Sequence, residues 1–76
     1  MRIDLALKQT GLIKRRTIAK QFCERGLVMV NDKVVKPSFE IKNNDFCTIK
    51  LGEKIIKIKF VIEKTSKREF VKYESC

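Results

Sequence analysis

Hydrophobic residues recur at helical spacing in the first third of the chain. Segment 2–9 carries Ile3, Ala6 and Leu7 on one side, and segment 14–26 carries Ile18, Ala19, Phe22 and Cys23 on one arc of a helical wheel. Thr10 and Gly11 interrupt the pattern, and Gly26 can adopt the left-handed conformation that ends a helix. The pattern therefore predicts two short helices joined by a tight turn.

After Gly26 the hydrophobic period changes to two. Val28 and Val30 precede a turn at Asn31–Asp32, which predicts a hairpin with a strand at Val34–Val35. Segments 46–51 and 54–64 alternate apolar and polar residues, and Phe39 and Ile41 are expected to return to the core. The order of elements predicts an α+β fold in which two N-terminal helices pack on a small antiparallel sheet of about four to five short strands.

The length of 76 residues fits one small domain. We assign residues 1–64 to a single domain. Residues 65–76 show little periodicity, so we expect a C-terminal tail that is partly ordered or frayed.

Positive charge is concentrated near the N-terminus. The chain has 18 Lys and Arg against 9 Asp and Glu, a formal net charge of +9. No carboxylate occurs between Asp4 and Glu24, whereas the later lysines alternate with glutamates. This distribution favours an anionic polymer as partner for the first third of the chain, and a merely solvated basic face is the alternative. Asp4 and Glu24 are expected to pair along the helices with Lys8 and Arg25 or with nearby lysines, and pairing of Arg2 with Asp4 is the alternative to a polymer-binding role for Arg2.

Residues for catalysis or metal binding are scarce. The chain has no histidine, no glycine-rich phosphate loop and three widely spaced cysteines, so neither an enzyme, nor a metal site, nor a cofactor is expected. Cys23 and Cys47 are expected to be small core residues in a reducing compartment. No apolar run approaches the roughly 20 residues that span a membrane, so a cytoplasmic location without membrane contact is expected.

Arginine and lysine near the start of the second predicted helix suit phosphate binding. Arg15 and Arg16 can contact phosphates through two N–H groups, and Lys14 and Lys20 add point charges. Phe46 is the one aromatic residue before the tail that is expected on an open strand face. Recognition of folded RNA by shape and phosphate contacts is therefore favoured over reading of single-stranded bases, although charge alone does not exclude DNA.

The chain resembles the RNA-binding domain named for small-subunit ribosomal protein four, the alpha-L motif. The resemblance covers about residues 1–52 and rests on the stretches MRIDLALK, IKRRTIAK and GLVMVNDKVVKPS and on the Asn44–Asp45 turn. Within that family, a domain of this length is similar to the ribosome quality-control factor P group and to the small heat-shock RNA-binding protein. Asp32 and Asn44 stand where glycine is common in the family, and Leu5 where lysine is usual.

The resemblance implies binding to ribosomal RNA and peptidyl-tRNA on stalled large ribosomal subunits, beside a quality-control factor that acts on the nascent chain. The protein is expected to act there as a monomer. By position, Arg2 and Arg16 match the RNA-contacting arginines of the group, and its binding surface implies Lys14, Arg15, Lys20 and Lys36. With Lys8 of the first predicted helix, these seven residues are the expected RNA-binding set. Two alternatives stay open: binding to another structured RNA, such as tRNA or small-subunit ribosomal RNA, and a protein adaptor that docks through Phe46, Val61 and the tail.

Overall fold

The computed structural model describes residues 1–76, the whole chain. Two helices come first, α1 (Ile3–Gln9) and α2 (Arg16–Glu24). Five strands follow: β1 (Val28–Val30), β2 (Lys33–Val34), β3 (Phe46–Leu51), β4 (Lys54–Lys64) and β5 (Glu69–Ser75). The strands form one sheet in the order β2-β1-β3-β4-β5, and every neighbouring pair is antiparallel. The predicted α+β class is confirmed.

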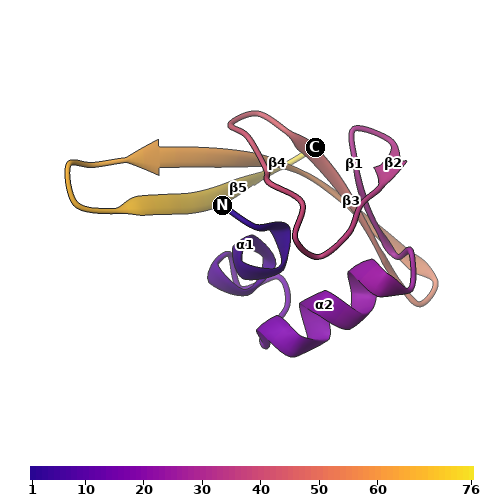
Figure 1. The fold of residues 1–76 in the computed structure, drawn as a ribbon. Coiled ribbons are helices and arrows are strands. Elements are labelled where there is room, and N and C mark those ends of the chain that lie inside the picture. Colours follow the sequence, from indigo (N-terminus) through magenta and orange to yellow (C-terminus); the bar gives the residue numbers. More distant parts are fainter.

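Both helices lie on the same side of the sheet (Figure 1). The buried face of the sheet is built from cross-strand rows such as Val30, Cys47 and Ile58. These rows pack with the apolar sides of the helices in a core of 15 buried hydrophobic residues, which includes Ile3 and Ala19. A strand turns alternate residues to opposite faces, so the remaining side chains lie on the other face of the sheet. Neither helix covers that face, because both helices lie on the first.

The predicted hairpin at Asn31–Asp32 is confirmed. Asn31 and Asp32 have φ values of 50° and 68°, so the turn has the positive φ angles that match the right-handed twist of a two-residue hairpin. Asn44 has a φ of 71°. Asparagine and aspartate tolerate this region, and the turns therefore form without the glycines that are common in the family.

Some expected core positions are wrong. Ile41 is buried, but Phe39 is 37% exposed and Ile18 is 39% exposed. Helix α2 is nine residues long and buries Ala19 and Cys23, and Phe22 packs against the core while partly buried. Lys14 and Arg15 precede α2 instead of lying in its first turn.

The C-terminal residues are more ordered than the partly ordered or frayed tail that was expected. Glu69–Ser75 forms β5, which pairs with β4 over seven residue positions, and Val71 is buried opposite Ile62. The alternation was not visible in the sequence because both faces of β5 carry an aromatic residue, Phe70 on one and Tyr73 on the other. Strand β4 is 11 residues long and pairs with β3 along one edge only. The N–H and C=O groups on its other edge pair with β5. Neither helix is long and apolar enough to cross a membrane.

Candidate nucleic-acid interface

A shallow hollow of about 260 Å³ lies where the two helices begin. Arg2 precedes α1 and Asp4 lies in its first turn, while Arg16 and Lys20 lie one turn apart on α2. These four side chains, hereafter the arginine cluster, line the hollow together with Thr17. The packing of α1 against α2 therefore joins charges that lie up to 18 positions apart in the chain.

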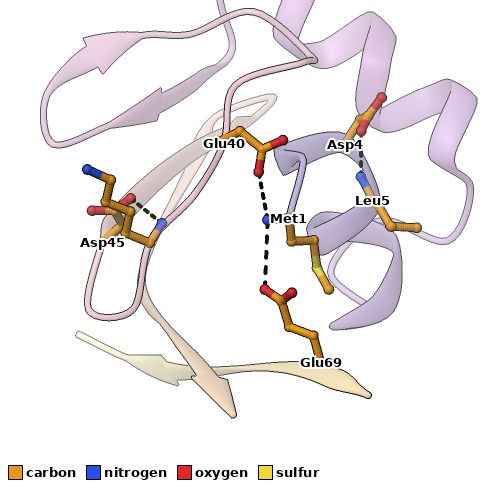
Figure 2. Close-up of polar contacts among 7 residues, drawn as sticks. Met1, Asp4, Leu5, Glu40, Asp45 and Glu69 are labelled. Carbon is orange, nitrogen blue, oxygen red and sulfur yellow. Dashed lines mark hydrogen bonds and ion pairs between the residues drawn. The ribbon is translucent and has the colours of Figure 1, made fainter. Parts of the chain in front are cut away.

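Asp4 organises the arginine cluster. Its side chain is only 3% exposed, and Oδ1 accepts the N–H of Leu5 at 2.7 Å (Figure 2). Oδ2 accepts a hydrogen bond from Nη2 of Arg2 at 3.2 Å, and Oδ1 forms an ion pair with Nε of Arg16 at 3.5 Å. The side chains of Arg2 and Arg16 remain 44% and 46% exposed. Each guanidinium is thus anchored at one edge and keeps further donors toward solvent.

The electrostatics of the cluster favour an anion. Three cations around one carboxylate leave a net formal charge of +2. Helix α2 has no acidic residue in its first turn, and no side chain caps its N-terminus. Because the first N–H groups of a helix lack partners and carry the positive end of the macrodipole, they add to the attraction. A phosphate group would satisfy both the side chains and the helix end.

The other predicted site residues lie outside this hollow. Lys8 is in the last turn of α1, Lys14 and Arg15 precede α2, and Lys36 follows β2; all four are exposed. None of the four forms an ion pair. The structure therefore gathers Arg2, Arg16 and Lys20 into one cluster and leaves four further cations free on the surface.

The expected pairing of Asp4 with Lys8 is wrong. Asp4 instead contacts Arg2 and Arg16, and Glu24 forms no ion pair with Arg25. Sequence reasoning weighed the pairing of Arg2 with Asp4, which the structure shows, but it missed the contact of Asp4 with Arg16 and the place of Thr17 in the lining. The available signal was that Asp4 is the only carboxylate before Glu24 and precedes the basic start of α2.

The segment 37–40 fixes the start of α1. The carbonyl groups of Pro37 and Phe39 accept the N–H groups of Asp4 and Ile3, at 3.3 and 2.8 Å. The ammonium group of Met1 lies 2.8 Å from Glu40 and 3.8 Å from Glu69 (Figure 2). These contacts hold Arg2 and Asp4 in place beside α2.

The buried cysteines are structural, and no group of His, Cys, Asp and Glu side chains could hold a metal ion. Burial, with a smaller effect of Asp4 and Glu24, raises the pKa of Cys23 to about 11. Burial, with a smaller effect of Cys23, raises the pKa of Cys47 to about 12. Both thiols therefore stay neutral near pH 7 and serve as small core side chains, as the hydrophobic pattern predicted.

Known proteins share this sequence pattern and fold. The S4 domain family matches residues 1–47. A protein of Halalkalibacterium halodurans named RQC P-site tRNA stabilizing factor is 40% identical over 76 residues, all of this chain and 82% of that protein. A Bacillus subtilis protein of the same name is 36% identical over 91% of this chain and 81% of its own length.

A solved structure has the same architecture. Heat Shock Protein 15 of Vibrio cholerae, described as trimeric, superposes with a TM-score of 0.74 and 30% identity. The match covers 87% of this chain and 65% of that one. The resemblance to the alpha-L motif is confirmed: this chain belongs to the S4-domain family and, within it, to the group of RQC P-site tRNA stabilizing factors.

Proposed function

We propose that this protein binds P-site tRNA and ribosomal RNA on stalled large ribosomal subunits during ribosome-associated quality control. The observation that carries the proposal is the arginine cluster at the uncapped start of α2. The relatives' name, RQC P-site tRNA stabilizing factor, supports tRNA as one ligand. A large subunit that carries peptidyl-tRNA presents both RNAs together.

The cluster would act by holding phosphate groups in fixed positions. Asp4 orients one edge of Arg2 and of Arg16, so that less side-chain entropy is lost when their outer donors contact phosphate. Lys20 adds a point charge one turn further along α2. Lys8, Lys14, Arg15 and Lys36 extend the positive surface, and none of them is neutralised by a neighbouring carboxylate.

The protein works in this proposal as a binding module and not as an enzyme. It stabilises an RNA arrangement on which a separate quality-control factor acts, in the cytoplasm, as a monomer without a cofactor. The expected effect of binding is a longer residence time of the tRNA on the large subunit. Binding through several phosphate contacts suits that role because the affinity does not require a particular base sequence.

Purified particles test the proposal directly. We expect tight binding to large subunits that carry peptidyl-tRNA, weaker binding to empty large subunits, and the weakest binding to small subunits. With about five phosphate contacts, log affinity should fall with a slope of about −4 per decade of salt concentration. Preferential binding to small subunits or free tRNA would favour the other structured-RNA hypothesis. Association that survives nuclease treatment would favour a protein adaptor.

A further inference from the structure

A second hollow, of about 500 Å³, lies between the β1–β2 hairpin and the segment that follows it. We name it the Val34–Phe39 groove, and it is lined by Val30, Asn31, Lys33, Val34, Val35, Lys36 and Phe39. Its volume is in the range of pockets that hold small organic ligands. No carboxylate is among the lining residues.

The groove combines exposed apolar surface with unpaired positive charge. Val34 and Phe39 are 61% and 37% exposed, above a floor formed by the buried Val30 and Val35. Neither Lys33 nor Lys36 forms an ion pair. A ligand with a flat apolar part and an adjacent anionic group would complement this surface.

Backbone hydrogen bonds join the segment of the groove to the start of α1, where the arginine cluster lies. Phe39 lies in the segment whose carbonyl groups accept the N–H groups of Ile3 and Asp4. On its other side, the hairpin turn is fixed by Asn31, whose side chain accepts the N–H of Phe46 at 3.1 Å and donates to Asp45 at 3.2 Å. Backbone hydrogen bonds therefore connect the segment that supplies Phe39 to the first turn of α1, which supplies Asp4 to the arginine cluster.

We propose that the Val34–Phe39 groove binds an unpaired nucleotide next to the structured part of the RNA. This inference rests on the proposed function, because the arginine cluster supplies the main contact with that RNA. The base would stack on Phe39 and contact Val34, and the adjoining phosphates would meet Lys33 and Lys36. RNA is favoured over an acidic peptide because a nucleotide supplies an aromatic plane and a phosphate together, beside a cluster that already suits phosphate.

Binding to two RNA hairpins tests the inference. One hairpin has flush ends, and the other carries an unpaired extension of three nucleotides. We expect the extended hairpin to bind about tenfold more tightly. Phe39→Ala and Phe39→Leu should both remove this difference and leave the affinity for the flush hairpin unchanged. Phe46→Ala, which removes an exposed ring from the uncovered sheet face, is the matched control and should keep the full difference.

The site of contact can be identified independently. With 5-iodouridine in the extension, we expect ultraviolet cross-linking to the peptide that contains Phe39, detected by mass spectrometry. Equal binding of the two hairpins, or cross-linking at Phe46, would overturn the inference while flush-hairpin binding still supports the RNA-binding function. Failure to bind either hairpin would contradict the inference, whereas the proposed function is tested separately by binding to large subunits that carry peptidyl-tRNA. Phe39-dependent binding of a Glu- and Leu-containing peptide, without the extension effect, would assign the groove to a protein partner.

Discussion

Asp4 and Arg16 join the first turns of the two helices through an ion pair of 3.5 Å between Oδ1 and Nε. The carboxylate is buried, whereas nearly half of the arginine side chain faces solvent. The buried carboxylate of Asp4 thus orients the guanidinium of Arg16, whose exposed side remains available to a ligand. The pair therefore connects the stability of the helix packing to the shape of the proposed RNA-binding surface.

Replacement of Asp4 distinguishes the effect of orienting Arg16 from the effect of the net charge of the arginine cluster. Asp4→Ala should lower the free energy of unfolding by about 1–3 kcal/mol in urea denaturation, because the N–H of Leu5 and the link between the helices lose their acceptor. Asp4→Asn raises the net charge of the cluster by one, yet we expect weaker binding to structured RNA because Arg16 is no longer held. An increase in affinity would show that charge alone matters.

Arg16 and Arg25 form a matched pair of arginines at opposite ends of α2. Arg16→Ala should weaken RNA binding by about 1–3 kcal/mol, and it should also lower the thermal midpoint because the buried Asp4 loses one of its two arginine partners, so binding is measured well below the midpoint. Arg25→Ala removes the same charge outside the cluster and should weaken binding much less. Titration of each variant against one structured RNA at fixed salt measures the difference. Equal losses from the two variants would contradict the assigned site.

Thiol labelling reports on the buried cysteines. At pH 8, iodoacetamide should modify Cys76, which is exposed, and leave Cys23 and Cys47 unmodified until the protein unfolds. The raised pKa values also predict a pH dependence. The stabilisation from keeping these thiols neutral is complete below pH 9.0 and is lost as the pH rises through about 11 for Cys23 and about 12 for Cys47. Mass spectrometry after labelling, and urea denaturation between pH 8 and 11, check both statements.

The contribution of β5 can be measured with two neighbouring residues. Val71→Ala should lower the free energy of unfolding by about 1–2 kcal/mol, because the side chain is buried opposite Ile62. Phe70→Ala removes a larger side chain from the opposite face and should change stability by about 0.5 kcal/mol or less. Similar effects of the two variants would mean that β5 does not pack on the core in solution.

The local pattern of the sequence was sufficient for most of the elements. Helical spacing predicted α1 and α2, and the period of two predicted the hairpin, β3 and β4. The pattern did not predict β5, because a strand with aromatic residues on both faces shows no clear alternation. It also placed Phe39 in the core, since hydrophobicity does not reveal whether an apolar residue lines a surface groove.

The sequence by itself determined the fold class, the concentration of positive charge before Glu24 and the candidate role of Arg16, because periodicity and charge are local properties of the chain. Only the tertiary structure decided that Asp4 pairs with Arg16 across the two helices and that Val34 and Phe39 share a groove with two free lysines. These relationships join residues that different elements supply. They depend on how the helices pack and on how the segment 37–40 returns to α1, which no local pattern specifies.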